Sequence, residues 1–276
     1  MSDVESLDNV DPGAENASVA VAGRQQRGTL MGFARVVASI LFIIALPVAI
    51  VTTNIRLLAN APAVYDYAFD HYDAESVTGI SRTELDGAGA AIRDYFNNGE
   101  KTFYYPVTID GLEQPIFNAT ETRHMEDVKS LMVQLNRVQE ISVIFVLAYV
   151  VAFFIWARDG EMRQLATQAL IGVGLGALVV GGIGVTAAFG FEAAFERFHG
   201  IAFANDFWQL NTRTDHLIQM FPEPFWRDMT ILLGAMSALV GFIIAAIAGV
   251  YLLGSRSERT RLASSVDMHA SPTQAA

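Results

Sequence analysis

Four long apolar stretches constrain the fold of this chain more than any other feature of its sequence. They cover residues 31–56, 138–157, 165–190 and 229–253, and each is long enough to cross the hydrocarbon core of a bilayer as a helix. The composition agrees, because 52% of the 276 residues are hydrophobic and only 17% are charged, which is unusual for a soluble domain. The sequence therefore predicts a mainly α polytopic membrane protein with four transmembrane helices.

The residue inventory excludes several functions. A formal net charge of −11 argues against a nucleic-acid partner, which would need a basic surface. The absence of cysteine excludes disulfides, thiolate metal sites and cysteine nucleophiles. No zinc-binding spacing and no Gly-x-Ser-x-Gly elbow occurs, so we expect no metal, no cofactor and no familiar serine nucleophile. Some thirty polar residues precede the first apolar stretch, so no cleavable signal peptide is expected.

Residues 57–137, between the first two crossings, are expected to form a small α+β extracytoplasmic cap. Ser81-Arg-Thr-Glu84 has the spacing of a capping box, which predicts that a helix begins there. Two short strands are then predicted over Phe103–Ile109 and Leu112–Phe117. They are joined by Asp110-Gly111, a residue pair favoured in type I′ hairpins.

A second capping box, Asn118 with Glu121, begins the last helix of the cap. The apolar residues of this helix share one stripe: Val128, Leu131, Met132, Leu135 and Val138. Such a stripe predicts a helix that reclines on the membrane surface. If the helix instead ran straight into the second crossing, His124 would stand about 25 Å above the apolar edge.

Four crossings place both termini on one side of the membrane. That side carries most of the arginines near crossing ends and is therefore expected to be cytoplasmic: Arg24, Arg27, Arg35, Arg158, Arg163, Arg256, Arg259 and Arg261. Residues 1–30 are expected to be a disordered cytoplasmic tail, and residues 254–276 a second cytoplasmic tail. In the third crossing, small residues such as Gly172 and Gly176 are expected to allow close helix packing rather than to bind phosphate.

Residues 191–228 are rich in aromatic side chains but cannot span a bilayer, because Asp206, Arg213, Asp215 and Pro222 interrupt every apolar run. Aromatic rings beside charges are typical of the membrane–water boundary. We therefore expect an interfacial aromatic loop on the same face as the cap.

Histidines are the remaining candidates for chemistry. His124 is followed three residues later by Asp127, and His199 lies at helical spacing from Glu192 and Glu196. Two histidines with carboxylate neighbours suffice for acid–base catalysis, although histidines near interfacial helix ends are also common as polar tips or caps. No catalytic role is expected for the other three: His71 and His269 in polar segments, and His216 beside a helix cap.

Two long motifs resemble a known family. They are HMEDVK at His124–Lys129 and FERFHGIAF…DFWQL…TDHLIQMFPEPFW within residues 195–226. Both motifs, together with the layout of four crossings and a large first outer insertion, resemble the bacterial lipoprotein intramolecular transacylases, Lit. The N-terminal tail is not part of the resemblance.

The resemblance implies an O-to-N acyl shift in the membrane. The sn-2 acyl chain of a diacylated bacterial lipoprotein would move from glycerol to the α-amino group of its N-terminal cysteine. The two family histidines fall on His124 and His199. We hypothesise His124 as the base and His199 as the acid, an order that the sequence alone does not fix.

Residues that could orient these groups or stabilise an oxyanion are Asp127, Glu196, Arg123, Asn205 and Trp208. Imidazoles about 4–8 Å apart could act on one tetrahedral centre. Two alternatives remain open: a non-catalytic membrane scaffold that docks through the aromatic loop, and a hydrolase of lipid or lipoprotein esters. A transporter is disfavoured, since no crossing carries an ionisable residue near its centre.

Overall fold

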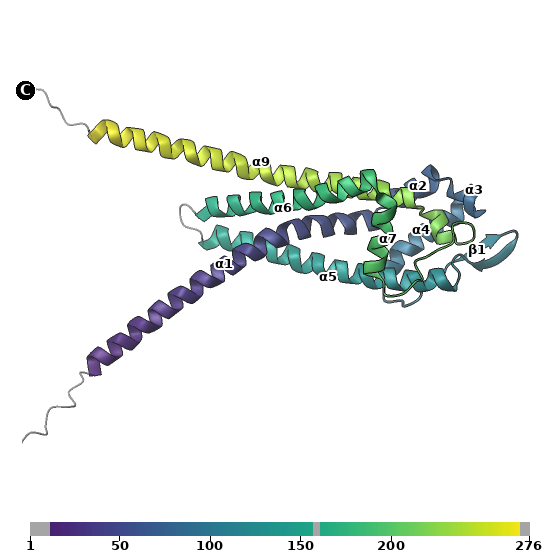
Figure 1. The fold of residues 1–276 in the computed structure, drawn as a ribbon, viewed down its shortest axis with the longest axis horizontal. Coiled ribbons are helices and arrows are strands. Elements are labelled where there is room, and N and C mark those ends of the chain that lie inside the picture. Colours follow the sequence, from purple (N-terminus) through teal and green to yellow (C-terminus); the bar gives the residue numbers. More distant parts are fainter. Residues whose placement is uncertain (1–11, 157–160, 271–276) are drawn as a thin grey trace, which may run out of the picture.

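The computed structural model describes residues 12–156 and 161–270, with side chains over 29–155, 161–186 and 188–255. Most of this backbone is helical (Figure 1). Within the described residues, four helices are long and apolar enough to cross a membrane. They are α1 (Pro12–Asn60), α5 (Ala119–Trp156), α6 (Glu161–Phe189) and α9 (Glu223–Ala270). The predicted architecture of four membrane helices with a small sheet is confirmed.

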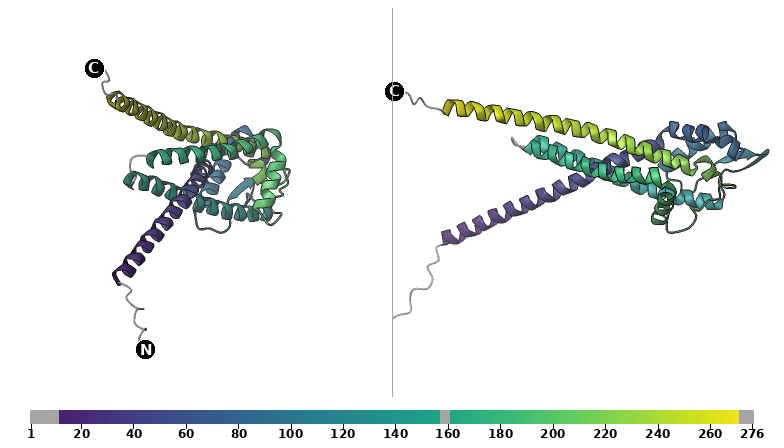
Figure 2. Two further views of the ribbon diagram at one scale, coloured as in Figure 1. Left: turned by 60° about the vertical axis from the view of Figure 1, so that its left-hand side comes forward. Right: turned by 45° about the horizontal axis from the view of Figure 1, so that its top comes forward.

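The four long helices pack together next to the cap, and the start of α1 and the end of α9 diverge at the opposite end (Figures 1 and 2). Helix α6 packs against both α1 and α9, and α1 also packs against α5. Glycines permit the closest approach: an added Cβ on Gly176 would lie 2.9 Å from Cβ of Pro47, and one on Gly172 would lie 3.0 Å from the Ile43 carbonyl oxygen. Small residues therefore set the spacing between α1 and α6, as expected.

Hydrogen bonds also join three of these helices. The Tyr149 hydroxyl donates to Oε1 of Gln168 over 2.9 Å, and Nε2 of Gln168 donates to Oγ of Ser39 over 2.8 Å. Oγ of Ser39 lies 3.1 Å from the Tyr149 hydroxyl, which closes a triangle between α1, α5 and α6. Hydrogen bonds between polar side chains stabilise a membrane bundle, because lipid tails offer these groups no hydrogen-bond partner.

The ends of the outer helices differ from expectation. Helix α1 begins at Pro12, so residues 12–30, for which we expected disorder, are helical. Alanine, the residue with the best helix propensity, occurs four times in the first turns of α1, and no proline follows until Pro47. Helix α9 likewise extends beyond residues 229–253 at both ends. Residues 1–11 and 271–276 lie outside the described residues.

The cap follows α1 and consists of α2 (Pro62–His71), α3 (Ala74–Thr78), α4 (Arg82–Asn97), β1 (Pro106–Ile109) and β2 (Leu112–Pro115). Oγ of Ser81 accepts the backbone N–H of Glu84, so the predicted cap of α4 is present. The strands pair antiparallel with Ile109 opposite Leu112. Asp110 and Gly111 both have positive φ, 54° and 77°, as a type I′ turn requires.

Helix α5 contradicts the expectation of a reclining surface helix. The predicted cap at its start is present, because Asn118 N–H donates to Glu121 and Glu121 N–H donates to Asn118. From there the helix runs without interruption for 38 residues to Trp156. It contains no proline or glycine, so nothing separates its polar first half from the crossing. His124 therefore lies near the first end of one unbroken helix, far from Trp156 at the other end.

Residues 191–228 form two helices and the start of α9. Gly190 ends α6, and α7 (Phe191–Ala202) then runs across the long helices (Figure 1). After an irregular segment, α8 (His216–Met220) precedes α9. Part of this aromatic region belongs to the cap, since Met220, Phe221 and Phe225 are buried in the same core as Tyr65 and Phe69.

Candidate functional site

His124 and His199 lie side by side at the cap end of the bundle. The centroids of their rings are 6.0 Å apart, and the ring planes differ by 37°. His124 lies on the second turn of α5 and His199 on the last turn of α7. This distance falls within the range in which both imidazoles could act on one tetrahedral centre.

The position of α7 makes this approach possible. Gly190, at φ −173° and ψ 46°, breaks the helical path between α6 and α7, so that α7 leaves the top of α6 towards α5. Helix α7 ends at Ala202, and the N–H of the following Phe203 donates to the His199 carbonyl oxygen over 2.9 Å. The turn at Gly190 therefore carries His199 across the bundle to His124.

His199 is buried, with 8% of its surface exposed, and its tautomer follows from its surroundings. Its Nδ1 lies 2.7 Å from the carbonyl oxygen of Phe195. A carbonyl oxygen can only accept, so Nδ1 carries the proton and Nε2 keeps a lone pair. Burial lowers the pKa of His199 below its usual value, although the bond to Phe195 opposes this. At neutral pH this ring is therefore a neutral base.

His124 is buried to the same degree, with 7% exposed. Its Nδ1 has no hydrogen-bond partner among the described residues, and it is the one fully buried side-chain nitrogen or oxygen there of which this holds. A buried nitrogen without a partner costs about 1–3 kcal/mol. Such a group leaves room for a hydrogen bond to a molecule other than the protein.

Aromatic rings enclose both histidines. Phe203 contacts the ring of His124 edge-on, with centroids 5.1 Å apart, and lies 5.6 Å from the ring of His199. The rings of Phe195 and Trp208 lie 4.2 Å and 5.1 Å from His199. Apolar walls of this kind exclude water and strengthen electrostatic effects inside the site.

The contacts link three of the five predicted supporting residues to the histidines or their helices: Asp127, Asn205 and Trp208. Asn205 donates to Oδ2 of Asp127 over 2.9 Å, which ties the segment after α7 to α5 one turn beyond His124. Trp208 lies on His199, as described. Arg123 instead forms an ion pair with Glu126.

Glu196 is exposed on α7 and has no hydrogen-bond or ion-pair partner within the described part of the chain. Phe203 was not among the predicted residues. Its spacing of four from His199, on the same helical face, could have suggested contact with that histidine.

The other histidines lie apart from this pair. Nδ1 of His216 bonds to the carbonyl oxygen of Ile116 over 2.7 Å, which anchors the start of α8 to the cap. His71 stacks on Tyr67 with centroids 4.9 Å apart. The side chain of His269 lies outside the described residues. Within the described part, no group of three or more His, Asp or Glu side chains is placed to hold a metal ion.

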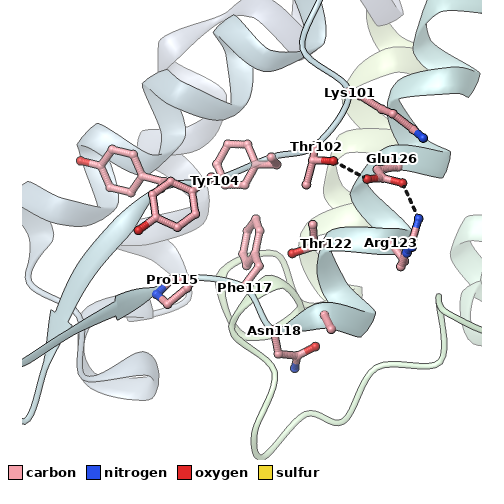
Figure 3. A pocket seen from close by; sticks show the side chains of 12 residues that line it. Lys101, Thr102, Tyr104, Pro115, Phe117, Asn118, Thr122, Arg123 and Glu126 are labelled. Carbon is pink, nitrogen blue, oxygen red and sulfur yellow. Dashed lines mark hydrogen bonds and ion pairs between the residues drawn. The ribbon is translucent and has the colours of Figure 1, made fainter.

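Two hollows flank the histidine pair without including it. One, of about 540 Å³, lies beside the start of α5 and includes Arg123, Glu126 and Thr102, which are linked by hydrogen bonds (Figure 3). The other, of about 820 Å³, is lined in part by α7 and shares Phe195 and Trp208 with the surroundings of His199.

A polytopic membrane protein with a buried histidine pair under a cap is the class that this fold and site define. Residues 40–226 match the family described as lipoprotein intramolecular transacylase Lit. The chain therefore belongs to the Lit family.

Solved structures support the same fold. The Lit transacylase of Bacillus cereus is similar with a TM-score of 0.68 at 15% identity, over 82% of this chain and 99% of that one. A variant of that protein with one histidine replaced by arginine gives a TM-score of 0.64 at 14% identity, over 85% of this chain and 99% of that one.

A protein of Aquifex aeolicus (strain VF5), described as uncharacterized, is 30% identical over 129 residues. That match covers 46% of this chain and about half, 54%, of the length of the relative.

Proposed function

We propose that this protein is a lipoprotein intramolecular transacylase. It would move the sn-2 acyl chain of a diacylglyceryl-cysteine lipoprotein from the glycerol oxygen to the cysteine α-amino group. The observation that carries the proposal is the pairing of His124 and His199 at 6.0 Å inside aromatic walls. Family membership supports the same reaction class.

The proposed reaction needs no nucleophile from the protein, which fits a chain without cysteine. The substrate amine attacks the ester carbonyl of the same molecule, and a C–N bond forms as the amine proton passes to a histidine. The tetrahedral intermediate then collapses, the C–O bond to glycerol breaks, and the leaving oxygen takes that proton. The proposed acyl transfer consumes no water and needs no redox partner or cofactor. Holding amine and ester together exploits the high effective molarity of an intramolecular step.

The tautomer of His199 favours this residue as the base, the reverse of the order suggested from sequence. Its Nδ1–H is held by the Phe195 carbonyl, so the free Nε2 is available to accept the amine proton. His124, whose buried nitrogen lacks a partner, would receive that proton and deliver it to the glycerol oxygen, so that both rings end the reaction neutral. Both steps occur near one centre, so a proton can be passed between the rings through the substrate.

Among the candidates for stabilising the oxyanion, the contacts favour Trp208. Asn205 already donates to Asp127, and Arg123 is paired with Glu126. The Trp208 indole N–H has no partner within the described side chains, and its ring lies against His199. A single well-placed donor contributes about 10²–10³ in rate.

The cap and the histidine pair are proposed to face the extracytoplasmic side, with the termini in the cytoplasm. The arginines near the crossing ends favour this orientation. It would place the site at the outer leaflet of the cell membrane, with membrane lipid around the bundle.

Mass spectrometry of a diacylated reporter lipoprotein, incubated with the protein in liposomes, tests the proposal. Because the reaction is an isomerisation, the intact mass stays constant while fragment ions place one acyl group on the α-nitrogen. Loss of an acyl group would instead indicate a hydrolase, and an unchanged peptide would indicate a scaffold.

Replacing His124 or His199 by alanine should lower the transfer rate by about 10²–10⁴, the usual contribution of an acid or base. His216→Ala is the matched control, since its ring also bonds to a backbone carbonyl but lies away from the site. Full transfer by either of the first two variants, at equal membrane levels, would refute the assignment.

A further inference from the structure

The larger hollow is built differently from the apolar enclosure around the histidines. It lies between α7, the segment around Trp208, and the region from α8 to the start of α9, and its volume is about 820 Å³. This size is within the range of ligand-binding sites. Its lining is both apolar and polar, since Leu210, Ile218 and two prolines lie beside Gln209, Thr212 and Gln219. Such a lining suits a polypeptide better than an acyl chain, because lipid tails offer no hydrogen bonds.

The charges of this hollow are of one sign. Glu192, Glu196 and Glu223 line it, and none of its fourteen lining residues is Lys, Arg or His. None of the three carboxylates has a hydrogen-bond or ion-pair partner among the side chains that the structure describes. Glu192 and Glu223 lie in the first turns of α7 and α9, where a negative charge stabilises the helix. Their charge nevertheless remains available to an occupant of the hollow.

The hollow adjoins the histidine site through a shared wall. Phe195 and Trp208 line the hollow, and both also contact the ring of His199. A substrate whose ester lies at His199 could therefore extend into the hollow within a few covalent bonds.

We infer that this hollow binds the polypeptide segment that directly follows the lipidated cysteine, with a preference for basic over acidic side chains. The inference rests on the proposed transacylase function. Three unpaired carboxylates would attract lysine or arginine in the segment and repel aspartate or glutamate. The hollow would then act as a specificity site for the protein part of the substrate.

Two synthetic diacylglyceryl-cysteine peptides, one with lysines and one with aspartates at the following positions, test the inference. The full-length protein is placed in neutral phosphatidylcholine bilayers, so that the membrane surface attracts neither peptide. Charges about 7 Å apart in water interact weakly, but three carboxylates together should give a preference of about tenfold in kcat/KM at low salt. The preference should fall as salt is added and lie in KM rather than kcat.

The variant E192Q/E196Q/E223Q should abolish the preference by weakening use of the basic peptide and improving use of the acidic one. Glu196→Gln alone, which leaves both helix starts intact, should reduce it partly. Glu113→Gln, on the exposed strand β2, is the control for net charge and should leave it unchanged.

Failure of both peptides to be N-acylated would overturn the proposed function itself. Transfer to both with equal kcat/KM, or a preference that survives the triple variant, would overturn the docking inference while the transacylase function stands.

Discussion

Gly176 offers a sharp test of how the bundle positions the site. A Cβ at this position would lie 2.9 Å from Cβ of Pro47, whereas carbon atoms pack at about 3.5–4.0 Å. Gly176→Ala therefore requires α6 and α1 to separate by about 0.6–1.1 Å, because the proline ring cannot rotate away. Overpacking of this kind costs about 1–3 kcal/mol, offset by at most about 1 kcal/mol of improved helix propensity.

Gly181→Ala and Gly184→Ala are matched controls, since an added Cβ at either position meets nothing within 4 Å. Thermal unfolding in detergent should show Gly176→Ala melting several degrees below both controls, at about 2–4 °C for each kcal/mol in a chain of this size. Activity should fall as well, because α6 carries α7 and therefore His199. A displacement of about 1 Å at a catalytic group can cost roughly 10²-fold in rate. If Gly176→Ala matches Gly184→Ala in both stability and rate, the close contact between α1 and α6 does not determine the position of the site.

Three further predictions concern individual contacts. Asn205→Asp should reduce transfer more than Asn205→Ala, since it places a carboxylate against Asp127 instead of merely removing a donor; steady-state rates of the two variants decide this. Because burial lowers the pKa of His199, this base should become protonated only at a pH below its ordinary pKa of about 6.5. The substrate amine, with pKa about 8, should then alone govern kcat/KM between these values. A pH profile that shows a second protonation at or above pH about 6.5 would contradict this. Tyr149→Phe should destabilise the bundle by about 0.5–2 kcal/mol, because it leaves Oε1 of buried Gln168 without its donor, while transfer at low temperature is unchanged; unfolding in mixed micelles measures it.

Features governed by neighbours in the chain could be predicted from sequence. The Asp110-Gly111 turn and the caps at Ser81 and Asn118 depend on residues one to three positions apart, and all are present. The four crossings depend on composition over some twenty residues and could therefore also be predicted from the sequence.

Features governed by tertiary contacts were not predictable in the same way. The apolar stripe after Asn118 is the same whether a helix meets lipid or protein, so the pattern could not show that α5 continues straight. Phe221 and Phe225 look interfacial in sequence but are buried in the cap core beside Tyr65. The tautomer of His199 depends on the Phe195 carbonyl, which no side-chain pattern reveals.

The approach of the two histidines depends on helix lengths rather than on any motif. The apolar part of α6, residues 165–189, is about 36 Å long, roughly 6 Å more than a hydrocarbon core of about 30 Å. A helix of this length that crosses upright would carry Gly190 and α7 beyond the hydrocarbon core. On the antiparallel helix α5, the whole length of α6 counted back from Trp156 reaches about Val128, one turn from His124. On α5, His124 lies well beyond the apolar part of the crossing, so a shorter α6 would leave α7 and His199 below it. Because α6 is long, α7 reaches His124, and the rings of the two histidines come within 6.0 Å of each other.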